Sequence, residues 1–166
     1  MSTEVVMNKE YTCSFTGHRK IGCAAYSSLG RQLFTKITQL IQKGYTCFCS
    51  GGALGFDLLA AQTVIRLKED FPSIRLCMIL PCRNQDKFWT EAQKAEYQAV
   101  LRNADEVIYT SEAYYRGCML KRNRVMVDAS SYVLAFLENE TGGTKYTVDY
   151  AVKQGITLEF LSAKPA

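Results

Sequence analysis

The segment YTCFCSGGALGFDLLAAQTVIRLKEDFPSIRLCMILP, residues 45–81, decides the predicted fold of this chain. It opens with an apolar run, residues 45–50, that is typical of a buried strand, and residues 74–80 form another such run. Between the two runs, apolar residues recur at helical spacing after a group of glycines, and the pattern stops before Pro72. A strand, a helix of about ten or more residues and a second strand make a βαβ unit, which predicts parallel neighbouring strands.

The same alternation continues in both directions from this segment. Strands are expected at residues 11–16, 45–50, 74–80, 105–109, 132–137 and 156–161, and helical patterns at 29–41, 54–71, 87–101, 117–129 and 144–153. We therefore predict one α/β domain over residues 11–161, with a doubly wound, mostly parallel sheet of about six strands and helices on both faces. Residues 1–10 are expected to be a flexible N-terminal end, and residues 162–166 a C-terminal tail.

Composition excludes several classes of protein. Of the 166 residues, 48% are hydrophobic and 22% charged, with a net charge of +4, which excludes disorder and gives little support to nucleic-acid binding. No apolar run approaches the ~20 residues of a membrane span, and residues 1–9 lack the pattern of a secretory signal. Seven cysteines without such a signal predict reduced thiols in the cytoplasm. Cys47 and Cys49 are expected on one face of a strand as core residues, and with one histidine in the chain no metal site is expected.

Three glycine-containing loops follow predicted strands. They are TGHR at residues 16–19, SGGALGFD at 50–57 and ETGGT at 140–144, which contains the GGT run at 142–144. The carboxyl ends of parallel strands meet at one edge of the sheet, where ligands bind near the topological switch point. Two of the loops lead directly into helices, an arrangement that presents backbone N–H groups to an anion. The chain lacks the dinucleotide-binding fingerprint, the P-loop and the nucleophile elbow, and glycines at these positions also suit tight turns.

These loops, together with KRNR at residues 121–124, resemble the SLOG superfamily, which joins the DNA-processing recombination mediators to the LONELY GUY phosphoribohydrolases. The stretch from Leu80 through Asp105, with Gln85 and Trp89, and the stretch from Tyr115 through Asp128 resemble the YpsA-like branch. The resemblance implies a Rossmann-like fold and a pocket for a nucleotide or a nucleotide-derived ligand. It implies no required cofactor.

The candidate site combines the loop residues with two residues of the KRNR motif. The candidate ligand-binding residues are Thr16, Gly17, His18, Arg19, Ser50, Gly51, Gly52, Gly55, Asp57, Arg122, Asn123, Gly142, Gly143 and Thr144. Either arginine suits a phosphate, and we expect Arg122 to reach the pocket while Asn123 braces a loop. Asp57 suits ribose hydroxyls and is also the candidate catalytic residue, as an acid or base at a glycosidic bond.

Each of these residues also has a purely structural interpretation. The glycines suit a turn packed against the sheet, Asp57 the N-terminus of a helix, and Thr144 a helix cap. His18 suits an acid/base role or a hydrogen bond to backbone, and the basic residues of the KRNR motif suit either nucleic acid or a solvated face. Trp89 is expected in the core rather than stacked on a base, and the sequence leaves the roles of Tyr114 and Tyr115 open.

Three functions follow from these residues. The first is binding or sensing of a nucleotide-derived ligand such as ADP-ribose, NAD or a nucleoside monophosphate. The second is a nucleotide N-glycosidase that uses Asp57, although the phosphoribohydrolase motif Gly-Gly-x-Gly-Thr-x-x-Glu is incomplete here: the GGT run has one glycine fewer and no glutamate three residues after Thr144. The third is single-stranded DNA binding, which the modest charge disfavours. The expected partner is a small nucleotide rather than a membrane, and a homodimer stays open.

Overall fold

The computed structural model describes residues 7–139 and 141–164. Its strands and helices follow the predicted order, and a short 3-10 helix, η1 (Lys9–Tyr11), precedes them. The strands are β1 (Thr12–Gly17), β2 (Cys47–Ser50), β3 (Arg75–Leu80), β4 (Glu106–Tyr109), β5 (Tyr132–Phe136) and β6 (Thr157–Phe160). The helices are α1 (Cys23–Gln42), α2 (Phe56–Leu67), α3 (Glu91–Asn103), α4 (Cys118–Asp128) and α5 (Gly143–Lys153).

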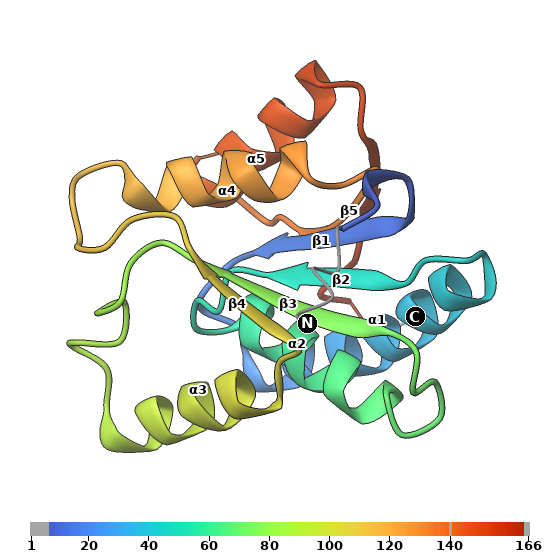
Figure 1. Ribbon diagram of the computed structural model, residues 1–166, viewed down its shortest axis with the longest axis horizontal. Helices are drawn as coiled ribbons and strands as arrows, with labels where there is room; N and C mark the ends of the chain where they lie inside the picture. Colours follow the sequence, from blue (N-terminus) through green and yellow to red (C-terminus); the bar gives the residue numbers. More distant parts are fainter. Residues whose placement is uncertain (1–6, 140, 165–166) are drawn as a thin grey trace, which may run out of the picture.

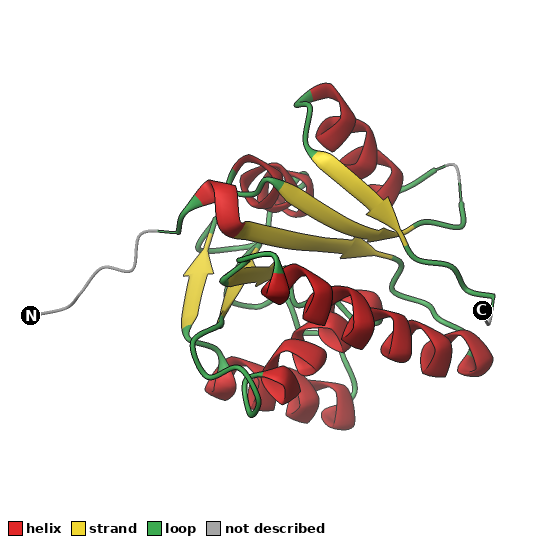
Figure 2. Cartoon of the chain, turned by 90° about the vertical axis from the view of Figure 1, so that its right-hand side faces the viewer, coloured by secondary structure: helices red, strands yellow, loops and turns green. Residues whose placement is uncertain are grey.

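The six strands form one sheet in the order β4-β3-β2-β1-β5-β6, and every pair of neighbours is parallel. The helices lie in two layers, with α1, α2 and α3 on one face and α4 and α5 on the other (Figures 1 and 2). This confirms the predicted doubly wound, Rossmann-like architecture. The strand order reverses between β1 and β5, so the topological switch point lies at the carboxyl end of β1.

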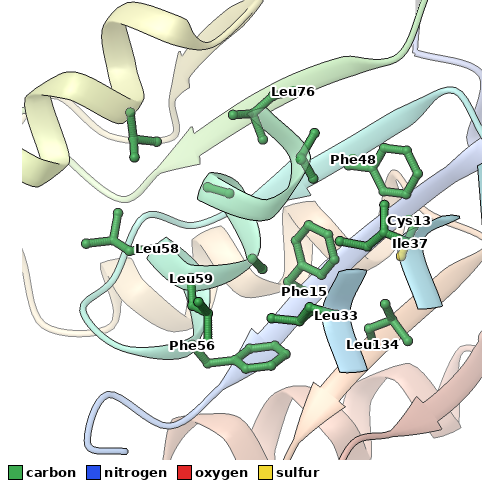
Figure 3. Close-up of a cluster of buried hydrophobic side chains, with 14 of the residues drawn as sticks. Cys13, Phe15, Leu33, Ile37, Phe48, Phe56, Leu58, Leu59, Leu76 and Leu134 are labelled. Carbon is green, nitrogen blue, oxygen red and sulfur yellow. The ribbon is translucent and has the colours of Figure 1, made fainter. Parts of the chain in front are cut away.

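The main core fills the space between the sheet and the layer of α1 and α2 (Figure 3). Leu33 and Ile37 of α1 are fully buried, as the helical stripe predicts. They face the sheet beside Phe15 of β1 and Phe48 of β2, whose rings stack 6.3 Å apart. Because the apolar stripe of α1 packs against the strands in one core, the helix and the strands hold each other in place. This packing fixes the carboxyl ends of the strands, where the candidate loops begin.

The start of α3 differs from the prediction. The pattern beginning at residue 87 assigns Phe88 to the buried stripe of a helix, yet α3 begins at Glu91 and Phe88 is 90% exposed. The physical reason is a capping box: the Thr90 hydroxyl accepts from the Gln93 backbone N–H, and the Gln93 side chain accepts from the Thr90 backbone N–H.

The two ends of the chain are partly described. Residues 1–6 of the predicted flexible end lie outside the described residues, whereas Asn8 caps η1 and the Met7 sulfur lies 3.6 Å from the Cys49 sulfur. Residues 165–166 of the predicted tail also lie outside, and Ser162 exchanges two backbone hydrogen bonds with the side chain of Gln32. All seven cysteines are free thiols. Within the described ranges, no helix combines the length and apolar character needed to cross a membrane.

Candidate functional site

A cavity of about 220 Å³ lies at the switch point, at the carboxyl end of β1. It is enclosed by the loop after β1, the start of α2, one face of α4 and the start of α5. Its lining residues are Thr16, Gly17, His18, Arg19, Ala53, Asp57, Met119, Leu120, Arg122, Asn123, Gly143 and Thr144. A larger open groove of about 690 Å³ runs between α1 and α2, but it lies away from the ends of the strands.

Asp57 is a buried carboxylate in the first turn of α2. It is only 7% exposed, it lines the cavity, and its Oδ1 has no hydrogen-bond partner among the described residues. Burial raises the pKa of Asp57 from 3.8 to about 6, and this rise is opposed by the charge of Arg122, by a backbone hydrogen bond from Ala53 and by the charge of Arg19. A buried oxygen without a partner is costly, so a hydrogen-bond donor that reached this carboxyl from the cavity would stabilise it.

Arg122 of α4 is a buried cation whose charge acts on this carboxylate. It is 3% exposed, and its Nη1 donates to the backbone carbonyl of Gly51 at 2.5 Å. Its Nε donates to Asn123 Oδ1 at 2.7 Å. Both residues line the cavity, and Asn123 orients the neighbouring arginine through this hydrogen bond. The 100° separation of adjacent residues on a helix had instead predicted that Asn123 braces a loop. The asparagine side chain folds back along the helix far enough to reach Nε.

A second guanidinium approaches from the loop after β1. Arg19 Nη2 donates to Met119 Sδ at 3.4 Å, and Arg122 Nη2 donates to the same sulfur at 3.8 Å. The two arginines therefore converge from separate segments, and each is repelled by the charge of the other. Their total charge exceeds that of Asp57 by one, which favours an anion in this cavity.

The start of α5 also contributes to the wall of this cavity. Gly142 caps the helix without a side-chain hydrogen bond, and Gly143 and Thr144 line the cavity. The first N–H groups of a helix have no acceptor within the helix, and the positive end of its dipole attracts an anion. The corresponding end of α2 is occupied, because the Phe56 N–H donates to the backbone carbonyl of His18 at 3.1 Å.

His18 connects the loop after β1 to the loop after β5 by hydrogen bonds. Its Nε2 accepts from the backbone N–H of Glu138 at 2.7 Å and of Asn139 at 3.3 Å. Its ring also packs edge-on against Phe136, with the ring centroids 5.6 Å apart. The structure thus gives His18 the backbone-bonded role that the sequence offers as an alternative to acid/base chemistry.

The glycines of the loop after β2 contact protein rather than the cavity. A Cβ on Gly51 would lie 2.6 Å from the Arg122 guanidinium, and one on Gly52 would crowd Leu80 and Tyr97. The Ser50 hydroxyl donates to the backbone carbonyl of Asp57. Of the candidate ligand-binding residues, those absent from the cavity lining are Ser50, Gly51, Gly52, Gly55 and Gly142.

The remaining candidates separate into different surroundings. Lys121 donates to the backbone carbonyl of Thr110, and Arg124 donates to the Tyr146 hydroxyl, so the basic residues of the KRNR motif do not share one patch. Trp89 packs edge-on against Tyr97, with centroids 5.1 Å apart, at the margin of the core. Tyr114 and Tyr115 are 62% and 46% exposed.

Three residues of the cavity lining are not among the candidates from the sequence: Ala53, Met119 and Leu120. Of these, Met119 contacts both arginines through its sulfur. It precedes Arg122 and Asn123 by three and four residues, and these positions share one face of an α-helix. Helical spacing counted back from the arginine would have identified it.

The raised pKa of Asp57 predicts a pH-dependent stability. Because the folded state holds this proton more tightly than the unfolded state, the stability it contributes is complete below pH 3.8 and is lost as the pH rises through about 6. The difference corresponds to ~3 kcal/mol, at ~1.4 kcal/mol per unit of pKa. As the pH rises from 4 to 7, we expect the free energy of unfolding to fall less in Asp57→Asn than in the parent. Urea titration at each pH measures both curves. Parallel curves for the two proteins would contradict the expectation.

Comparison with known protein families identifies the relatives of this chain. The family model YpsA, described as the YspA SLOG family, matches residues 16–161. The chain is 33% identical over 135 residues to the uncharacterized SPbeta prophage-derived protein YoqJ of Bacillus subtilis, covering 74% of this chain and 79% of YoqJ. It is 30% identical over 122 residues to the UPF0398 protein YpsA of the same organism, covering 72% of this chain and 68% of YpsA.

Solved structures share the fold at lower identity. DNA processing protein A (DprA) from Streptococcus pneumoniae superimposes with a TM-score of 0.69 at 16% identity. The Helicobacter pylori protein, described for its single-stranded DNA binding mode, gives 0.67 at 20%, and the molybdenum cofactor binding protein from Rippkaea orientalis gives 0.58 at 18%. Each match covers 93% of this chain, which spans 51%, 66% and 77% of those three chains, respectively.

Proposed function

This chain belongs to the YspA SLOG family, and from that premise we propose that it binds a nucleotide-derived ligand in the cavity at the end of β1. The ligand class is that of ADP-ribose, NAD or a nucleoside monophosphate. Arg19 and the first turn of α5 hold a phosphate, and Asp57 accepts a hydrogen bond from a ribose hydroxyl. We place this binding in the cytoplasm, where free cysteines stay reduced.

One observation carries the proposal: Asp57, whose buried Oδ1 has no hydrogen-bond partner in the described part of the chain, lines a cavity where two arginines converge. A lone phosphate would suit the arginines but would be repelled by Asp57. A lone sugar would suit Asp57 but would leave the excess positive charge uncompensated. A sugar phosphate satisfies both ends of the cavity.

The volume of the cavity sets which part of the ligand it encloses. At about 220 Å³ it is smaller than the pockets of roughly 300–1,000 Å³ that enclose whole drug-sized ligands. We therefore expect the ribose phosphate to lie inside and the base, or a second nucleoside, to lie at the rim.

Thermal unfolding with a ligand panel tests this function. The panel contains ADP-ribose, NAD, AMP, GMP, CMP and a short oligo-dT, each added to the parent, Asp57→Ala, Arg19→Ala and Arg124→Ala. A ligand at 100 times its Kd adds ~2.7 kcal/mol of stability, and in a domain of this size each kcal/mol raises Tm by roughly 2–4 °C. We expect one nucleotide to stabilise the parent and Arg124→Ala and to lose its effect in the other two variants.

Two results would contradict nucleotide binding at this cavity. One is a panel with no shift for any nucleotide, and the other is a shift that survives both Asp57→Ala and Arg19→Ala. A shift with oligo-dT alone would favour single-stranded DNA binding instead.

The position of Asp57 also favours a second candidate, nucleotide N-glycosidase activity. A carboxyl with a pKa of about 6 is partly protonated near neutral pH, as a general acid at a glycosidic bond must be. This activity would use one water molecule to break the bond between base and ribose of a nucleoside monophosphate, giving free base, which takes up a proton, and ribose 5-phosphate, which takes up the hydroxyl. Chromatography of AMP, GMP and CMP incubated with the folded protein tests it, with Asp57→Asn as the control. The absence of product above that control would exclude this activity on those substrates.

A further inference from the structure

The Met119 sulfur occupies a position between two positive charges. Arg19 and Arg122 both donate to Sδ, at 3.4 and 3.8 Å. A thioether is a weak acceptor, so it compensates little of the charge that converges on it. This sulfur therefore marks the point from which one strong acceptor atom would reach both guanidinium groups.

Met119 is also open to small reagents in solution. It is half-buried, and the cavity that it lines has the exposed residues Arg19 and Gly143 in its wall. Two other methionines are enclosed, since Met78 is 0% and Met126 3% exposed. Met7 is half-buried but lines a separate small cavity.

We propose that Met119 is a site of reversible oxidation, and that its sulfoxide occupies the anion position of the cavity. The oxidant is hydrogen peroxide. A lone pair of Sδ attacks one peroxide oxygen, the O–O bond breaks, and that oxygen stays on sulfur as S=O while the other leaves as water after proton transfer. Sulfur is oxidised by two electrons and the peroxide is reduced by two. Methionine sulfoxide reductases, which draw electrons from dithiols, reverse the step.

The sulfoxide oxygen changes what the arginines bind. It is polar, and it accepts charge-assisted hydrogen bonds from both guanidinium groups at once. An incoming phosphate must then displace this oxygen, so the affinity for the ligand falls. This consequence rests on the proposed function, whereas the selective oxidation of Met119 does not.

The experiment compares three proteins that all carry Cys23→Ser, which removes the exposed thiol: the parent, Met119→Leu and Met7→Leu. Each is treated with hydrogen peroxide and then with dithiothreitol, and peptide mass spectrometry locates the added oxygen. Isothermal titration with AMP and with inorganic phosphate measures affinity before and after. We expect oxygen on Met119 well before Met78 and Met126, and an affinity loss of ~10-fold or more in the parent and Met7→Leu. Met119→Leu should keep the affinity of its own untreated sample, and sulfoxide reductase should restore the other two.

The outcomes separate this inference from the proposed function. If neither probe nor any other nucleotide of the thermal panel binds the untreated parent, the proposed function fails, and selective oxidation of Met119 is still judged by mass spectrometry. If a probe binds equally well after Met119 is fully oxidised, the inference is overturned and the proposed function stands. Oxidation of Met119 no faster than that of Met126 would also overturn it.

Discussion

The variant Gly55→Ala is expected to lose the native fold under conditions where the parent is fully folded. Gly55 caps α2 with φ +82°, a conformation that side chains rarely adopt. A Cβ at this position would also collide with the backbone carbonyl of Arg19 and lie 2.6 Å from that of His18. The His18 carbonyl cannot move freely, because it accepts from the Phe56 N–H. Strain and overlap together should cost ~4 kcal/mol or more, a large part of the 5–15 kcal/mol typical of a domain.

Gly142→Ala is the matched control. Gly142 caps α5 with φ +99°, but a Cβ there would have no neighbour within 4 Å. We expect this variant to fold and to lose ~1–3 kcal/mol, the cost of the backbone conformation alone. Circular dichroism and urea titration distinguish the two variants. Equal losses would show that the close approach of the loop after β1 has no energetic effect.

The loop that contains Gly55 shows which features can be predicted from a single sequence and which cannot. The glycines at residues 51–55 predict a turn between a strand and a helix, and the structure confirms the turn. The residues that these glycines contact, His18, Arg19 and Arg122, cannot be predicted from the sequence. Only the pairing of β1 with β2 and the crossover to α4 bring them close. The choice between a ligand cradle and a packed turn therefore depends on tertiary contacts.

The secondary structure was largely predictable because most elements carry a local signal. Apolar runs of about five residues and helical stripes predict each strand and helix, and Cys47 and Cys49 lie buried on one strand as expected. The start of α3 was missed because the capping signal at Thr90 conflicts with the apolar residues before it. The order of the strands was not predictable, since pairing between distant segments leaves no local pattern.

The candidate site was predictable to the extent that it depends on strand ends. Arg19, Asp57 and Thr144 each follow a different strand, so a parallel sheet brings them to one edge, and all three line the cavity. The hydrogen bonds within the site were not predictable. The contact of Arg122 with the Gly51 carbonyl and the sulfur shared by two arginines depend on side-chain directions.

Replacement of Arg122 by methionine is expected to lower the free energy of unfolding by ~3–5 kcal/mol at pH 8, because it removes a buried hydrogen bond from a charged donor and a charge that compensates the buried Asp57 carboxylate. The variant leaves the buried Asp57 carboxylate without the charge that compensates it most, and it removes the 2.5 Å hydrogen bond to the Gly51 carbonyl. The Gln85 side chain also donates to that carbonyl, but at 3.4 Å this hydrogen bond is long and compensates little. Arg124→Met is the matched control, because this arginine lies on the same helix and donates to the Tyr146 hydroxyl at the surface. We expect it to change stability by less than ~0.5 kcal/mol.

Two further measurements assign the loss to the charge of Asp57. Arg122 opposes the rise in the pKa of Asp57, so its removal should raise that pKa further, and the penalty should shrink as the pH falls and the carboxyl takes up a proton. In the double variant Asp57→Asn/Arg122→Met the uncompensated charge is absent, so its loss should be smaller than the sum of the two single losses by at least ~1 kcal/mol. Urea titrations of the parent, the two single variants and the double variant at pH 5 and at pH 8 provide these free energies of unfolding. Additive losses that do not depend on pH would mean that Arg122 stabilises the fold through packing and the Gly51 carbonyl, and that Asp57 tolerates burial without a counter-charge.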